Sequence, residues 1–127
     1  MNVLLDAHAF IWFLEGSDRL SDAAKQAIEA EENQCYVSIA SIWEMAIKES
    51  IGKLEMAIPF ERLSRLIWEN GIEILPIEFE HAQLISRLPF HHKDPFDRII
   101  IAQSIVDNML IVSADAYFSA YTRSIIW

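Results

Sequence analysis

The chain is poor in cysteine and glycine, and both shortages exclude classes of protein. One cysteine, Cys35, among 127 residues allows no internal disulfide and no cage of thiolates around a metal. The three glycines form neither a phosphate-cradling G-x-x-x-x-G-K-S/T loop nor a G-x-G-x-x-G dinucleotide fingerprint. A G-x-S-x-G nucleophile elbow is also absent. The sequence therefore argues against nucleotide-binding folds of these types and against serine hydrolases.

Long hydrophobic runs are missing as well. Residues 1–16 are apolar, but Asp6 and His8 interrupt them and no basic leader precedes them, so we expect neither a signal peptide nor a membrane helix. The chain has no low-complexity stretch and no internal repeat. We expect one domain, residues 1–127, in the cytoplasm and without a membrane partner.

Basic residues are few relative to acidic ones. The chain has 10 lysines and arginines against 19 aspartates and glutamates, a formal charge of −9, whereas general phosphate-backbone binders are usually basic. An excess of carboxylates also suits a protein that binds divalent cations or a basic partner, so the charge does not exclude nucleic acid as a ligand. The apolar share of 53% exceeds the usual ~45–50% and indicates surface buried against a partner or a second copy.

The hydrophobic pattern alternates short strands with helices. Four apolar runs are expected to be strands, at residues 2–5, 35–38, 72–75 and 109–112. Helices are expected at residues 7–16, 21–33, 39–50, 60–70, 78–88 and 94–108, before a short helix and a possible last strand. Short apolar strands separated by helices predict an α/β fold with a parallel sheet covered on both faces.

Four acidic residues are expected near one edge of this sheet. In open parallel sheets the ligand site lies beyond the carboxyl ends of the strands. Asp6 directly follows the first strand, Asp115 lies three residues after the fourth, and Glu44 is in the first turns of the helix after the second. Asp97 opens the helix before the fourth strand, and the sequence alone leaves open which edge it reaches.

Each acid also has a purely structural interpretation. Asp6 could cap the helix that follows it, and Asp115 could form a turn with Ser113. Asp97 could be the third residue of a helix that Asp94 caps, where a carboxylate faces the positive helix end.

Glu44 has two structural alternatives of its own. It could complete an S-x-x-E capping box with Ser41, or it could pair with Lys48 one turn later. However, Glu44 and Asp6 both interrupt apolar surroundings, where a lone carboxylate is costly.

If these carboxylates converge, their mutual repulsion must be relieved. A hard divalent cation does this, and an all-oxygen site suits Mg²⁺ or Mn²⁺. Such an ion lowers the pKa of a bound water and stabilises charge on a phosphoryl oxygen. The pattern therefore indicates hydrolysis of phosphodiesters.

Polar residues near the acids in sequence are candidates for substrate contacts. The residues selected are Ser113, Lys48 and Arg98. Lys53 and Lys93 are further basic candidates, with a solvated or ion-paired role as the alternative. His91 and His92 are expected in a polar loop rather than as metal ligands.

Four segments together resemble the PIN-domain ribonucleases, and among these the VapC-type toxins of toxin–antitoxin pairs. The segments are LLDAHAFIWFL at 4–14, SIASIWEMAIKESIGKL at 38–54, LPFHHKDPFDRIIIAQS at 88–104 and LIVSADAYFSAY at 110–121. Their combination and spacing, above all DPFDR…AQ with an upstream SIWE, carry the likeness over essentially the whole chain.

The resemblance implies a three-layer α/β/α sandwich with a central parallel sheet and an Mg²⁺- or Mn²⁺-dependent endoribonuclease. It assigns catalysis and metal binding to Asp6, Glu44, Asp97 and Asp115. It also implies a cognate antitoxin and a homodimer. Asp94 matches the family pattern too, and we keep it as a helix cap.

Two positions depart from the family pattern. Relatives often have threonine after the first aspartate, where this chain has Ala7 and loses a hydroxyl. They often have threonine two residues before the last aspartate, where Ser113 keeps one.

Three other functions compete with the nuclease. The first is a catalytically silent PIN-like module that binds RNA or an antitoxin, against which the intact acidic set argues. A response-regulator phosphotransfer domain would need a pair of acids after the first strand, where Ala7 follows Asp6. A D-x-D-x-T phosphatase would need an aspartate in place of His8.

Overall fold

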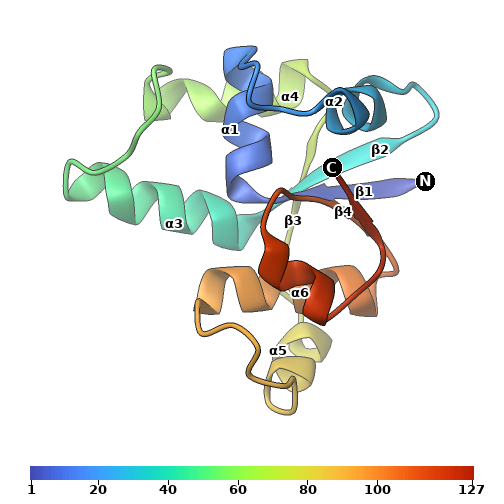
Figure 1. Ribbon diagram of the computed structural model, residues 1–127. Helices are drawn as coiled ribbons and strands as arrows, with labels where there is room; N and C mark the ends of the chain where they lie inside the picture. Colours follow the sequence, from blue (N-terminus) through green and yellow to red (C-terminus); the bar gives the residue numbers. More distant parts are fainter.

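The computed structural model describes residues 1–127 and is built around a sheet of five parallel strands (Figure 1). The strands are β1 (Asn2–Leu5), β2 (Gln34–Ser38), β3 (Glu73–Leu75), β4 (Leu110–Val112) and β5 (Ile125–Ile126). Their order is β3-β2-β1-β4-β5, so β1 is central, and every neighbouring pair is parallel. The predicted parallel sheet is confirmed, with each predicted strand found within one residue of its expected bounds.

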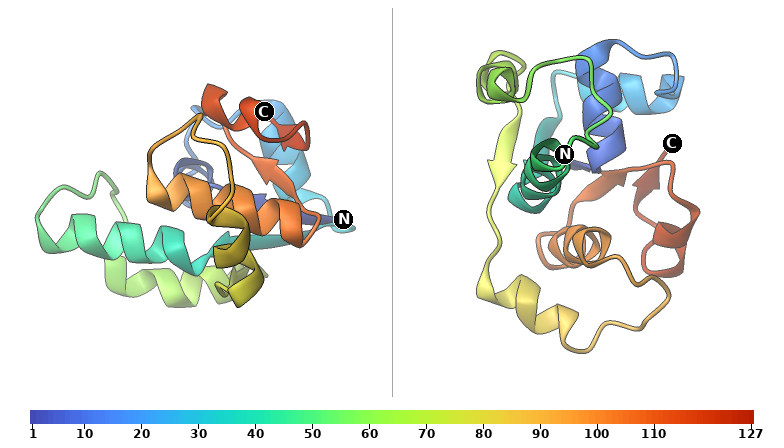
Figure 2. Two further views of the ribbon diagram at one scale, coloured as in Figure 1. Left: turned by 90° about the horizontal axis from the view of Figure 1, so that it is seen from below. Right: turned by 90° about the vertical axis from the view of Figure 1, so that its left-hand side faces the viewer.

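Helices cover both faces of the sheet. They are α1 (Ala7–Glu15), α2 (Asp22–Glu29), α3 (Ile39–Ser50), α4 (Leu63–Glu69), α5 (Phe79–Ile85) and α6 (Pro95–Val106), with 3₁₀ turns η1 (Phe60–Arg62) and η2 (Ala116–Ala120). The right-hand view of Figure 2 shows α1, α2 and α4 on one side and α5, α6 and η2 on the other. The three-layer α/β/α sandwich is confirmed.

Two hydrophobic cores result from the alternation of side chains along the strands. Val3 and Leu5 of β1 pack with Phe10 of α1 in the larger core. Leu4 points to the other face and packs with Ile100 of α6 in the smaller one. Since β1 is buried on both faces, its sequence reads as a continuous apolar run rather than an alternating one.

The helix ends depend on local capping groups. Ser21 caps α2 through its Oγ, which accepts a hydrogen bond from the Ala24 amide at 3.1 Å, and Gly16 ends α1 in a left-handed conformation with φ of 64°, which favours glycine. Helix α2 ends at Glu29, four residues before the predicted end. Its acidic continuation forms a turn in which the Asn33 side chain donates to the Ala27 carbonyl.

The two longest helices, α3 and α6, have 12 residues each. No helix combines the length and the apolar character that crossing a membrane requires. Helix α6 is buried along Ile100–Ser104, but Ile105 and Val106 in its last turn are exposed.

Candidate active site

The four predicted acids line one recess beside the carboxyl ends of β1, β2 and β4. The recess has a volume of about 150 Å³ and includes Asp6, Glu44, Asp97 and Asp115. It also includes Asp94, and Lys48 is the one lysine or arginine of its lining. Segments far apart in the chain therefore bring five carboxylates against one ammonium group.

Asp6 lies at the end of the central strand and is 5% exposed. Its backbone amide donates to the Val112 carbonyl of β4 at 3.1 Å, and its Oδ1 accepts from the Ala9 amide at 2.8 Å. The Asp6 side chain therefore caps α1 and also lines the recess. Burial raises the pKa of Asp6, although Ser113 and the Ala9 amide act in the opposite direction.

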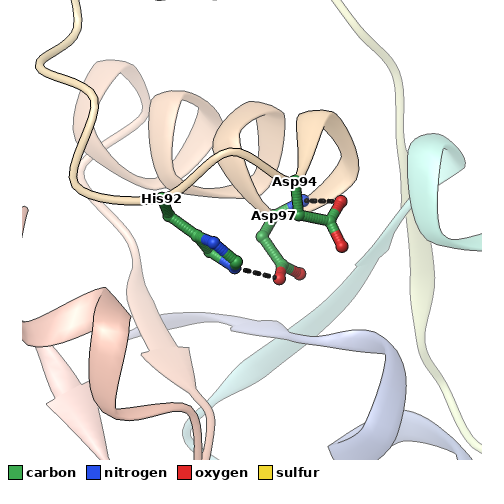
Figure 3. Close-up of side chains that lie close together, drawn as sticks. All are labelled: His92, Asp94 and Asp97. Atoms are coloured by element: carbon green, nitrogen blue, oxygen red, sulfur yellow. Dashed lines mark hydrogen bonds and ion pairs between the residues drawn. The ribbon is translucent and has the colours of Figure 1, made fainter.

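Asp97 reaches the recess from the first turn of α6. Asp94 caps this helix, because its Oδ1 accepts from the amides of Phe96 at 2.8 Å and Asp97 at 3.3 Å. The predicted arrangement of cap and third helical residue is therefore present (Figure 3). Burial raises the pKa of Asp97 to about 6, with smaller contributions in the same direction from the charges of Asp94 and Asp115.

His92 lies inside the acidic cluster, a position that the sequence reasoning missed. Its Nε2 is 2.8 Å from Oδ2 of Asp97 (Figure 3) and 3.7 Å from Oδ2 of Asp115. The ring stacks on Tyr117 with centroids 4.8 Å apart, and the backbone amide of His92 donates to the Tyr121 hydroxyl at 2.8 Å. The sequence did hold one signal for this position, since His92 comes two residues before Asp94, the cap of the helix that carries Asp97.

Asp115 and Ser113 form the turn that their spacing predicts. The Asp115 amide donates to Oγ of Ser113 at 3.0 Å, and Oδ1 of Asp115 accepts from the Tyr117 amide at 2.9 Å, which caps η2. Ser113 is 2% exposed and does not line the recess. Its hydroxyl supports Asp115, so the structure gives it a supporting place instead of the predicted substrate contact.

Glu44 projects from α3 into the recess and pairs with Lys48. Their side chains are 3.5 Å apart, one helical turn from each other, as the spacing predicts. The alternative capping box with Ser41 is wrong, because Ser38 caps α3 by accepting from the Ala40 amide at 3.0 Å. Ser41 lies within the helix, fully buried, and its hydroxyl has no hydrogen-bond partner.

Arg98 is placed differently from the prediction that it contacts substrate. It is 4% exposed, and its guanidinium donates to the carbonyls of Pro89 at 2.9 Å and Leu88 at 3.1 Å. It also lies over the Phe90 ring, 4.1 Å from the centroid. Arg98 therefore holds the segment before α6 in place and does not line the recess.

Comparison with known proteins agrees with this architecture. The family model of the PIN domain matches residues 3–124. This chain belongs to the PIN-domain family. Ribonuclease VapC22 of Mycobacterium tuberculosis is 32% identical over 114 residues, which span 89% of this chain and 86% of that protein.

Solved structures share the PIN fold at lower sequence identity. VapBC2 from Rickettsia felis, bound to a DNA fragment from its promoter, superposes with a TM-score of 0.69 at 16% identity and covers 98% of this chain and 96% of that chain. A toxin–antitoxin complex from Klebsiella pneumoniae gives a TM-score of 0.67 at 21% identity with the same coverage. At these identities the likeness establishes the fold.

The recess of this PIN domain has the donor set of a divalent-cation site. Carboxylate oxygens are the ligands that hard cations such as Mg²⁺ and Mn²⁺ prefer. His92, Asp94 and Asp97 each offer a ligand atom within 4.8 Å of the others, and the buried Asp6 carboxylate lines the same recess. A cation bound among these groups would stabilise the ionised carboxylates and so counteract the increase in pKa that burial causes at Asp6 and Asp97.

Proposed function

We propose that this chain is a metal-dependent endoribonuclease and the toxin of a toxin–antitoxin pair. The observation that carries the proposal is the convergence of Asp6, Glu44, Asp97 and Asp115 in one recess of a PIN domain. The 32% identity to a ribonuclease over most of both chains supports RNA as the substrate. With cellular RNA as its substrate, we place the protein in the cytoplasm.

In this proposal the four carboxylates hold Mg²⁺ or Mn²⁺. When bound, the ion supplies the Lewis acidity that phosphodiester hydrolysis by water needs. The Ala9 amide fixes Oδ1 of Asp6, and the Asp94 cap of α6 fixes the backbone of Asp97. His92 orients the Asp97 carboxylate through its 2.8 Å contact, which makes it a positioning residue. Lys48, beside Glu44, offers a positive charge to a substrate phosphate.

A cognate antitoxin and a second copy of the chain are the proposed protein partners. Two of the structural neighbours are a VapBC complex and a toxin–antitoxin complex, which supports the first. Large apolar side chains on the surface support a protein partner of either kind, and the most exposed aromatic ones are Trp68, Phe90, Phe79 and Trp43.

The deciding experiment is cleavage of total cellular RNA by purified, antitoxin-free protein. Reactions with Mg²⁺, with Mn²⁺ and with chelator are compared for the wild type, Asp97→Asn and Asp18→Asn. Asp18 is an exposed acid outside the recess, so its variant controls for the change in charge. We expect metal-dependent fragments from the wild type and Asp18→Asn and none from Asp97→Asn. RNA or antitoxin binding without any cleavage would instead support the silent module.

A further inference from the structure

A second recess adjoins the carboxylate recess on the side of α1. It has a volume of about 340 Å³, and four residues line both recesses: His8, Ile11, Lys48 and Leu54. The remaining lining residues are Trp12, Arg19, Lys53 and Glu55. Because these four residues form a shared wall, the two recesses are continuous enough for one polymer to reach both.

The charge of this second recess is opposite to that of the whole chain. Arg19, Lys48 and Lys53 line it against one acid, Glu55, although acidic residues outnumber basic ones by 19 to 10 overall. Cations grouped beside a hydrolytic site are suited to phosphate groups, since phosphates account for most of the affinity in protein–nucleic acid binding. In a protein that is acidic elsewhere, such a local group of cations determines where a nucleic-acid backbone binds.

The wall that carries Lys53 is held in place by specific contacts. The Lys53 amide donates to the Lys48 carbonyl at 2.8 Å, and the Ala57 amide donates to Oε2 of Glu15 at the end of α1, also at 2.8 Å. Leu54 and Met56 pack against the larger core. Figure 1 shows this segment leaving the end of α3 and leading towards α4. Lys48 and Lys53 are therefore held in the wall of the second recess before any ligand binds.

Aromatic side chains extend outward from His8, which lines both recesses. The His8 ring is exposed and lies 5.5 Å from the Trp12 ring, which in turn lies 5.7 Å from Trp127. Stacking on an aromatic ring requires a base that is free of its own stack. This arrangement favours an unpaired strand over a duplex.

We propose that the second recess binds single-stranded RNA next to the scissile phosphate. Arg19, Lys48 and Lys53 contact backbone phosphates, and one unpaired base stacks on His8. The inference rests on the proposed ribonuclease function, and it names the form of RNA and the path that the strand takes from the carboxylates.

The test measures RNA binding separately from cleavage. Binding of a short fluorescein-labelled oligouridylate is followed by anisotropy in the Asp97→Asn background with Mg²⁺, over a range of KCl concentrations. Arg19→Ala and Lys53→Ala should each weaken binding and reduce the slope of log K against log [KCl] by about 0.7, the value for one single-strand phosphate contact. The control is Arg87→Ala, which removes an exposed arginine beyond the end of α5 and should leave the slope unchanged.

Substitution of His8 tests the stacking contact. His8→Ala should weaken binding with the salt slope unchanged, and His8→Phe should restore affinity because it restores an aromatic face. A duplex of the same length should compete less well than the single strand.

The proposed RNA site in the second recess is refuted if Arg19→Ala and Lys53→Ala bind RNA as tightly as the Asp97→Asn background does. It is also refuted if Arg87→Ala loses as much affinity as they do, or if the folded background protein binds no RNA. Equal competition by the duplex overturns the single-strand assignment. Absence of metal-dependent cleavage by the wild type would instead overturn the proposed function, so the two failures are distinguishable.

Discussion

Replacing Asp97 with asparagine is expected to stabilise the metal-free protein above neutral pH while abolishing its activity. Burial raises the pKa of Asp97 from 3.8 to about 6, so the folded chain binds this proton more tightly than the unfolded chain does. Folding therefore becomes less favourable as the pH rises through that interval, because the carboxylate must ionise in a partly buried site. An asparagine carries no charge there, and its carbonyl oxygen still accepts a hydrogen bond from His92.

The size of the effect follows from the pKa shift. A shift of roughly two units corresponds to about 3 kcal/mol. The side chain of Asp97 is 22% exposed, and solvent screening lowers the expected gain to about 1–2 kcal/mol. With an unfolding entropy of about 2.1 cal/mol/K per residue, this amounts to an increase of about 4–8 °C in Tm.

Thermal unfolding with chelator, at about pH 8 and about pH 5, measures this gain. At the lower pH the wild-type Asp97 is itself protonated, so the advantage of the variant over the wild type should disappear. Asp18→Asn has the same change in charge at an exposed position and should shift Tm by little at either pH. Destabilisation by Asp97→Asn at the higher pH, or an equal gain at both, would refute the reasoning.

The remaining predictions concern metal, a helix cap and a buried arginine. Mg²⁺ or Mn²⁺ should raise the Tm of the wild type reversibly with chelator and shift Asp6→Asn much less; equal shifts would contradict the carboxylate site. Ser38→Ala should lower the free energy of unfolding by about 1 kcal/mol in urea titrations, because its hydroxyl caps α3; an unchanged midpoint would argue against that cap. Arg98→Met should expose residues 85–92 to proteolysis, because the carbonyls of Pro89 and Leu88 lose their donor; unchanged cleavage rates would show that the segment needs no such support.

The order of elements was predictable because each signal is local. The four-residue apolar runs form strands, and Ser21, Gly16 and Asp94 act as the caps and stops that their chemistry indicates. The Ser41 capping box, one of the two structural alternatives for Glu44, is wrong, because Ser38, the last residue of β2, caps α3. Local rules located the start of α3 at Ile39, but they did not decide which serine caps it.

Sequence alone also determined that Asp6 and Asp115 face the same edge, because Asp6 directly follows one parallel strand, Asp115 lies three residues after another, and such strands end together. It could not determine the position of Asp97, which depends on the path that α5 and the following loop take across the sheet. Arg98 is its sequence neighbour, yet successive residues on a helix point in different directions, and the direction of Arg98 leads into the segment before α6.

Tertiary structure decided which residues meet from separate parts of the chain. His92 approaches Asp97 and Asp115 because its loop is held against Tyr117 and Tyr121. The basic residues of the second recess, Arg19, Lys48 and Lys53, come from the loops that follow α1 and α3 and from α3 itself. Periodicity describes how neighbours along the chain are arranged, whereas contacts between distant segments depend on how the layers pack, and the electrostatics of the site come from those contacts.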